Sequence, residues 1–452
     1  MTKDGRKYDL KFKKIDQNSI RISGRDSMQV RINVVALPPL EEQRWYGLAQ
    51  GAARFLMMIR NASLSYRNTY SMALPGFLPD VGDMLGQSAV SGLRPGLDFA
   101  FGFVNDKYIT KAQNRGWLLN DENVSTPAVT SLTEDLQLKA TLEPIADLKI
   151  DLTATRTRTQ NNSIQYMYAG MPTTQSGSFN MTTISIGSAF EKSGNADNGY
   201  FSKTFAKFQN SLDRFQQRAE ARYAGGTYPE GTGMTGTFNP ENGTVDKYSA
   251  DVLIPAFLSA YSGGNSMDIF PSLLRMMPNW SLSYKGLGNL PWIKDHFRSV
   301  TLTHGYRSVY SVGSYNTFSS WVQYMGDLGF VSNTTTGTFL PSSRYDVSSV
   351  SINESFSPLV GLNVTLKNNM TLKAEYKKTR VLTLSMTSVQ INESGSNDIV
   401  FGWGYKVNDF KLSDLWGPRR RRGKSQTNNE DNKDNKNQKA TASKTSFNRS
   451  LN

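Results

Sequence analysis

The sequence contains no cysteine and only two histidines, His296 and His304, among its 452 residues. The lack of cysteine excludes a disulfide framework and every metal site built on thiolates. His304 falls on the apolar side of an alternating run, which favours a structural histidine. The one carboxylate close to His296 in the sequence is Asp295, whose side chain would point the opposite way on a strand. We therefore expect no metal ion and no cofactor.

Signatures of catalysis are missing as well. The sequence has no Walker loop, no nucleophile elbow and no HExxH motif, and its carboxylates are scattered along the polar sides of alternating runs. Residues 231–236 match G-x-G-x-x-G, but no strand signal precedes them and no helix signal follows them, as a dinucleotide site requires. This predicts a loop there. We do not expect an enzyme.

The chain also lacks a long apolar run. Its mean hydropathy is -0.47, and the nearest candidate for a spanning helix, residues 45–59, is short and contains Arg54. These features argue against membrane-spanning helices but not against a transmembrane barrel, whose strands contribute only about ten alternating residues each. The first residues lack the apolar segment of a secretory signal, so we expect either a cytosolic protein or a fragment of a longer chain.

Positive charge is concentrated at one end of the sequence. The formal net charge is +13, and residues 417–452 hold ten Lys and Arg against three Asp and Glu. This region is poor in apolar residues, so we expect a disordered tail. Its arginine run, 419–422, is expected in solvent or, as a second interpretation, on anionic lipid headgroups. Phe447 is the one aromatic residue among these charges, so a nucleic-acid partner is not expected.

What the sequence does contain is repeated alternation of apolar and polar residues, the period of a β-strand. Residues 278–315 hold two such runs, joined by a connector that contains Trp292. Residues 134–158 read as a hairpin that turns at Glu143 and Pro144, and residues 7–37 read as short strands. Several such units in a row predict an antiparallel sheet, in either a soluble sandwich or a membrane barrel.

The longest alternating run extends over residues 370–391 without Gly or Pro, after a predicted turn at Asn368 and Asn369. At about 3.4 Å per residue this strand would reach roughly 65 to 70 Å, whereas strands of globular proteins average about five or six residues. The length predicts a strand that overshoots a bilayer, with residues 399–407 as its partner. Lys378 and Arg380 interrupt its apolar face and are interpreted as lying at the headgroup level.

Alternation assigns the side chains of these two strands to two faces. The predicted lipid-facing residues are Leu372, Ala374, Tyr376, Leu382, Leu384, Met386, Phe401, Trp403 and Tyr405. The predicted lumen-facing residues are Thr383, Ser385, Thr387, Gly402 and Gly404. Aromatic residues outside and small residues inside are typical of the wall of a wide barrel.

One segment follows a helical period instead. Residues 201–222 repeat apolar side chains, mostly Phe, every three or four positions, with basic side chains between them. We expect an amphipathic helix packed on the sheet, and the alternative is a helix lying in a membrane interface.

Six stretches of the chain resemble the SprA/Sov family, the outer-membrane translocon of the type IX secretion system. The hallmark stretch, residues 278–310, reads PNWSLSYKGLGNLPWIKDHFRSVTLTHGYRSVY. The others read LPGFLPD and RPGLDFAFGF (within 74–103), ATLEPIADLKIDLTATRT (140–157), DVLIPAFLSAYSG (251–263) and LKNNMTLKAEYKKTRVLTLSM (366–386). The signature residues are Pro278, Asn279, Trp280, Trp292, His304, Gly305, Tyr306 and Arg307. The resemblance extends from about residue 41 to the end.

The resemblance implies an all-β fold with a few helices, in which long antiparallel strands form a segment of a very large transmembrane β-barrel. We expect short strands in 1–40, a barrel segment in 41–416 and a basic disordered tail in 417–452. The implied function is export of folded cargo proteins in gliding motility, at the bacterial outer membrane. The implied partners are outer-membrane lipid, the cargo, a lipid-anchored shuttle protein and a periplasmic plug protein.

The family chain is several-fold longer and begins with a signal, so we expect a fragment from its C-terminal part. An alternative from the residues alone is a soluble or surface-exposed β-rich binding or structural protein with a basic tail.

Overall fold

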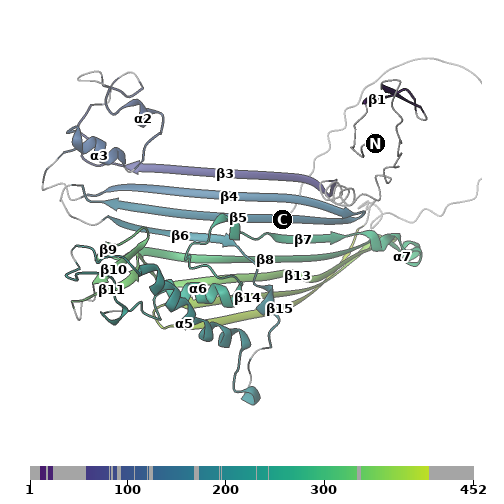
Figure 1. Cartoon of the computed structure of the whole chain (residues 1–452). Helices are drawn as coiled ribbons and strands as arrows, with labels where there is room; N and C mark the ends of the chain where they lie inside the picture. Colours follow the sequence, from purple (N-terminus) through teal and green to yellow (C-terminus); the bar gives the residue numbers. More distant parts are fainter. Residues whose placement is uncertain are drawn as a thin grey trace, which may run out of the picture. The chain divides into compact units, whose positions relative to one another are not determined.

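A computed structural model of the chain describes residues 11–16, 19–23 and 57–406, with gaps at 81, 83–84, 89–92, 106, 120, 122–125, 167–172, 193, 195, 231, 243 and 333–336. The described residues are mostly antiparallel β-structure with a few helices (Figure 1), so this part of the fold prediction is confirmed. Of the predicted N-terminal strands, β1 (Lys11–Lys14) and β2 (Ile20–Ser23) form a pair. The predicted tail, 417–452, lies outside the described residues.

The main sheet has ten strands. Its order is β15-β14-β13-β8-β6-β5-β4-β3, with β7 paired to β5 and β8, and β12 paired to β8. The strands are β3 (Ile59–Ala73), β4 (Ala128–Ile145), β5 (Leu148–Ile164), β6 (Thr174–Thr182), β7 (Asn279–Tyr284), β8 (Phe297–Thr317), β12 (Tyr345–Val347), β13 (Ser349–Leu366), β14 (Met370–Ser385) and β15 (Gln390–Tyr405). β8 has 21 residues, which corresponds to about 70 Å of extended chain. The predicted hairpin at 134–158 is present as β4 and β5, but its turn lies at Ala146 and Asp147 rather than at the predicted Glu143 and Pro144, which belong to the end of β4.

A second, smaller sheet has the order β11-β10-β9. Its strands are β9 (Trp321–Gln323), β10 (Leu328–Ser332) and β11 (Phe339–Ser343). The longer helices, α5 (Lys203–Tyr223) and α6 (Ala250–Tyr261), pack on each other over β13 and β14 (Figure 1). The short helices are α2 (Leu97–Ala100), α3 (Lys107–Asn114), α4 (Ile186–Ala189) and α7 (Pro291–His296), and the 3-10 turns are η2 (Ala196–Asn198), η3 (Pro240–Asn242), η4 (Leu273–Arg275) and η5 (Gly286–Asn289). Among the helices of the described residues, none has the length and apolarity needed to cross a membrane.

The single strand predicted over 370–391 is instead a hairpin. β14 ends at Ser385, residues 386–389 turn the chain, and β15 begins at Gln390. The turn contains no Gly, Pro or Asn, and Val389 supplies the positive φ of 51°. Because the usual turn residues are missing, the alternating pattern of apolar and polar residues continues through the turn, and the strand predicted from this pattern was too long. The partner strand is correspondingly longer than the predicted 399–407.

Strand register divides the main sheet into two faces, because residues paired directly across strands lie on the same side. One side, which we call face A, carries the pairs Leu372–Trp403 and Leu382–Ile352. The other side, face B, carries mostly Ser, Thr, Asn, Gly and charged residues. The row Thr301, Asn363 and Lys373 across β8, β13 and β14 is an example.

The largest core lies on face A, beneath α5 and α6. Phe215 of α5 and Phe257 of α6 are fully buried in one cluster with Tyr310 of β8 and Leu384 of β14. The predicted amphipathic helix is therefore present as α5, and its Phe stripe packs on the protein itself. Helix α6 was not predicted: nine of its 12 residues are buried, so its sequence is apolar all round and has no amphipathic period.

Candidate functional site

Face A is not covered by α5 and α6 toward the end of the sheet where α7 joins β8. Its exposed apolar side chains there, which we call the apolar band, are Leu64, Leu138, Leu362, Leu372, Tyr376, Ile399, Phe401, Trp403 and Tyr405. Phe401 is 80% exposed and Trp403 is 70% exposed. Exposed apolar surface that continues across several strands indicates contact with a partner or with lipid.

Face B is polar along the same strands, and several of its charged side chains form ion pairs with each other. Glu375 forms ion pairs with Lys373 at 2.8 Å and with Lys377 at 3.3 Å. Asp151 pairs with Lys149 at 2.9 Å and accepts a hydrogen bond from Thr141. Valines such as Val309 are the apolar exceptions. Face B is therefore hydrophilic without a strong charge of one sign.

The register places most predicted wall residues as alternation assigned them. Leu372, Ala374 and Tyr376 lie on face A opposite Trp403, Phe401 and Ile399, and Tyr405 lies on the same face opposite Met370. The residues on face B are Thr383, Ser385, Gly402 and Gly404. Thr387 lies in the turn between β14 and β15. Which solvent each face meets remains a prediction.

Three of the predicted lipid-facing residues require a correction. Leu382 and Leu384 are on face A, but both are 0% exposed because the helical layer of α5 and α6 covers them. Met386 is partly buried against the same cluster. Alternation gives the face of a strand but not what covers that face, so residues of the protein core were assigned to lipid.

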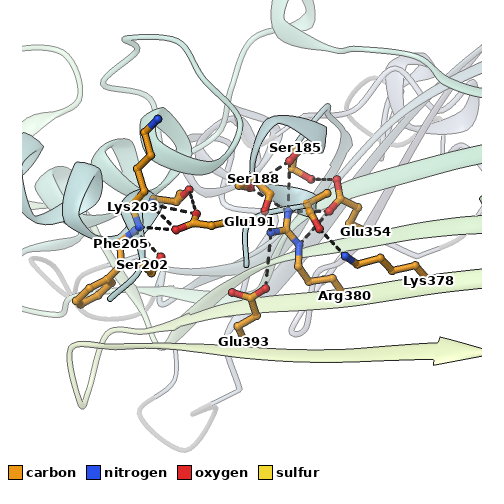
Figure 2. Close-up of polar contacts among 12 residues, drawn as sticks. Ser185, Ser188, Glu191, Ser202, Lys203, Phe205, Glu354, Lys378, Arg380 and Glu393 are labelled. Atoms are coloured by element: carbon orange, nitrogen blue, oxygen red, sulfur yellow. Dashed lines mark hydrogen bonds and ion pairs between the residues drawn. The ribbon is translucent and has the colours of Figure 1, made fainter. Parts of the chain in front are cut away.

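A buried charge cluster lies on face A between the apolar band and the helical cover (Figure 2). The side chains of Arg380 on β14 and Glu354 on β13 are 5% and 1% exposed and form an ion pair of 2.7 Å. Nε of Arg380 also donates to Glu354, at 3.0 Å. The second Glu354 oxygen accepts hydrogen bonds from the hydroxyls of Ser185 and Tyr306, both at 2.7 Å. This carboxylate and guanidinium therefore satisfy each other in a site closed to water.

The cluster connects the segment after β6 to the sheet through hydrogen bonds. Arg380 donates to the carbonyl oxygens of Ser188, at 2.8 Å, and Ser185, at 3.3 Å. Lys378 donates to the carbonyl oxygen of Ala189 at 2.7 Å and lies 4.9 Å from the ring centre of Phe190. Lys378 and Arg380 were predicted at a headgroup level. The structure gives them protein partners instead, at the border where the helical cover begins.

Sequence reasoning missed Glu354, although a signal for it exists. It is the one charged residue in β13, whose other polar residues are Ser, Asn and Thr. A lone carboxylate among alternating apolar residues needs a buried counter-charge, and Arg380 interrupts the apolar face two strand residues before Leu382. The partners Ser185 and Ser188 have no comparable signal, because they come from a distant part of the chain.

Four of the signature residues, Asn279, Trp280, His304 and Tyr306, lie in or beside this cluster. Trp280 stacks on Tyr306 with ring centres 4.4 Å apart, and Asn279 accepts a hydrogen bond of 2.8 Å from the backbone N–H of Ser308. Nδ1 of His304 lies 2.7 Å from the carbonyl oxygen of Leu359. A carbonyl oxygen can only accept, so this nitrogen carries the hydrogen and His304 is a structural donor.

The remaining signature residues have separate positions. A Cβ at Gly305 would come within 2.8 Å of the carbonyl oxygen of Ser357, so a side chain does not fit there without a shift. Arg307 is exposed on face B, and Pro278 precedes β7. Trp292 lies on α7 and is 66% exposed. No group of three or more potential metal ligands occurs in the described part of the chain.

A second charged hollow lies where α5 and α6 meet the small sheet. It has a volume of about 300 Å³ and contains Asp251, from the first turn of α6. Other charged residues lining it are Arg158, Arg222, Asp268, Asp327 and Arg344. Burial raises the pKa of the Asp251 carboxyl to about 6, although the positive charge of Arg222 and a hydrogen bond with Ser343 act in the opposite direction.

We expect the stability of the helical layer to fall as the pH rises through about 6. Because Asp251 binds a proton more tightly in the folded state, its contribution is fully present below about pH 4 and is lost as the pH rises through about 6. The Asp251→Asn variant stays neutral, so its melting temperature should change less between about pH 4.5 and about pH 7.5 than that of the wild type. Asp213→Asn, at an exposed carboxylate, is the control. Equal pH profiles for wild type and Asp251→Asn would contradict this expectation.

Comparison with protein-family models and with curated protein sequences finds no match for this chain. The resemblance to the SprA/Sov family therefore stands on the quoted stretches alone.

Proposed function

We propose that this chain is a segment of an outer-membrane, protein-conducting β-barrel, with face A toward lipid and face B toward a hydrated passage. The observation that carries the proposal is the division of the sheet into an exposed apolar band and a polar opposite face across β3, β4, β13, β14 and β15. A soluble sandwich would bury the apolar side against a second sheet. A barrel wall exposes it to lipid and keeps polar residues inside.

The strand order adds a requirement. Among the described residues, β3 and β15 end the order and are not paired with each other. A free strand edge in lipid would leave backbone N–H and C=O groups without partners. We propose that further strands along these two edges complete the wall. The SprA/Sov resemblance supports the further proposal that this barrel is the translocon of type IX secretion, with cargo proteins, a lipid-anchored shuttle protein and a periplasmic plug protein as proposed partners.

The Leu372→Arg and Thr371→Arg variants test the proposed orientation. Leu372 is 43% exposed on face A and Thr371 is its exposed neighbour on face B. Arginine on the lipid side of a barrel costs about 2 to 4 kcal/mol near the bilayer midplane, whereas arginine toward water costs little. We expect Leu372→Arg to reduce assembly into lipid bilayers strongly and Thr371→Arg to have a small effect. The yield of folded, protease-resistant protein in liposomes measures both.

The same pair separates the barrel from the soluble alternative. In a soluble β-rich protein, arginine at the half-exposed Leu372 would change stability by no more than about 0.5 kcal/mol, as at most surface positions. Equal assembly of the two variants, or recovery of the wild-type chain in the soluble fraction without detergent, would contradict the proposed function.

A further inference from the structure

Helix α5 has a basic side that faces away from the core. Lys203, Lys207 and Arg214 are exposed and spaced four and seven residues apart, which brings their side chains to one side of the helix. They line a hollow of about 480 Å³ together with Phe201 and Asn210. The proposed barrel wall makes no use of this hollow.

The acidic groups close to this hollow already have other partners. Glu191 accepts hydrogen bonds from the backbone N–H groups of Lys203 and Thr204 at the start of α5. Burial would raise the pKa of Glu191, but hydrogen bonds from Thr204, Ser202 and the helix backbone hold it below its ordinary value. Asp213 pairs with Lys247. Glu191 therefore stays ionised and accepts the hydrogen bonds of the free N–H groups at the start of α5. Because these N–H groups already have a partner, an anion in the hollow must be bound by side chains.

The three cations themselves are unneutralised. Within the described residues, none of the ion pairs involves Lys203, Lys207 or Arg214. Figure 2 shows the side chain of Lys203 extending away from Glu191 and from the Arg380 cluster. The guanidinium of Arg214 lies 5.1 Å from the ring centre of Phe215, a contact that leaves its positive charge without a counter-charge. The hollow thus offers three positive charges to a negative ligand.

Exposed aromatic side chains flank the start of α5. Tyr200 is 74% exposed, Phe201 is 60% exposed and Phe190 is 55% exposed. Phe190 also contacts Lys378, at the border between the apolar band and the helical cover. Aromatic rings beside lysines at the edge of an apolar surface are typical of the lipid–water interface. A small soluble anion would need the charges but not the exposed rings.

We propose that the hollow on α5 binds the phosphate group of an anionic lipid headgroup at the edge of the bilayer. This inference rests on the proposed function, because it requires the apolar band to lie in lipid. The basic side chains then contact the headgroup phosphates just beyond the apolar band, while the rings of Phe190 and Phe201 insert into the membrane–water interface. Each Lys or Arg near an anionic surface strengthens binding about fivefold, so three contribute about 100-fold at low salt.

Lipid binding to the full chain in zwitterionic detergent tests the inference, with phosphatidylglycerol as the probe and native mass spectrometry as the readout. The triple variant Lys203→Gln, Lys207→Gln, Arg214→Gln should bind phosphatidylglycerol about 100-fold more weakly and lose its salt dependence. A charge-matched control replaces exposed Lys13, Lys14 and Lys107 with Gln and should bind as the wild type does. All six positions are exposed, so folding of both variants is expected.

Two results would overturn the inference. One is equal affinity of the triple variant, the control and the wild type for phosphatidylglycerol. The other is displacement of the lipid by inorganic phosphate at equal concentration, which would identify a site for a free anion. Insertion into phosphatidylcholine bilayers is measured in parallel. If the wild type inserts but the substitutions leave its affinity for phosphatidylglycerol unchanged, the inference fails while the proposed function stands. If Leu372→Arg and Thr371→Arg insert equally well, the proposed function fails, because face A then does not meet lipid.

Discussion

Replacing Arg380 with alanine should lower the free energy of unfolding by about 3 to 5 kcal/mol, because the buried carboxylate of Glu354 loses its counter-charge. The carbonyl oxygens of Ser185 and Ser188 lose their donor in the same change. Equilibrium denaturation of the detergent-solubilised full chain measures the loss. This is the largest effect that we expect from a single side chain outside the hydrophobic core.

Two controls separate burial from simple loss of an ion pair. Arg60 pairs with Glu143 at 2.7 Å, but their side chains are 63% and 40% exposed, so Arg60→Ala should cost about 0 to 1 kcal/mol. The double variant Arg380→Met, Glu354→Gln removes both buried charges and should be more stable than Arg380→Ala alone. Equal losses for Arg380→Ala and Arg60→Ala would show that the cluster is accessible to water.

Leu384→Ala should cost about 2 to 5 kcal/mol, the usual range for a truncated leucine in a packed core. Leu384 is 0% exposed, in the cluster that includes α5 and α6, whereas Leu372 on the same face of the same strand is 43% exposed. In detergent, Leu372→Ala is therefore the matched control. It should cost well under half as much, because it opens no cavity in the protein.

One result for these two variants would contradict the helical cover over Leu384. Equal losses for Leu384→Ala and Leu372→Ala would mean that α5 and α6 do not cover this part of the sheet. The original assignment of Leu384 to lipid would then apply again. Thermal unfolding of both variants in the same detergent is sufficient to decide this.

Much of the sheet was predictable because alternation is a local property. The hairpin of β4 and β5, the connector between β7 and β8, and the turn at Asn368 and Asn369 each have a signal within a few residues. Asn369 indeed adopts a positive φ of 65°. The turn at 386–389 has no such signal, so the sequence pattern continued through it.

The candidate site was harder to predict, because its parts are brought together by tertiary structure. The period of the strand places the side chains of Leu372 and Leu384 on the same face of the sheet. It does not show that α5 and α6 cover Leu384. Helix α6 is apolar on all sides and therefore resembles a buried strand as much as a helix. The pairing of Arg380 with Glu354 depends on the register of β13 and β14, which alternation alone does not fix.

The hydrogen bond between Arg380 and Ser188 also has a consequence for how the chain folds. The two residues are 192 positions apart in the sequence, whereas β13, β14 and β15 follow one another through short turns. Contacts between residues far apart in the sequence are slow to form, because the chain loses conformational entropy on closing the loop before the contact can stabilise the fold. We expect the three C-terminal strands to associate first and Arg380 to capture the segment after β6 late. Until that step, Glu354 would remain hydrated. The buried ion pair between Arg380 and Glu354 would therefore be complete only in the last stage of folding.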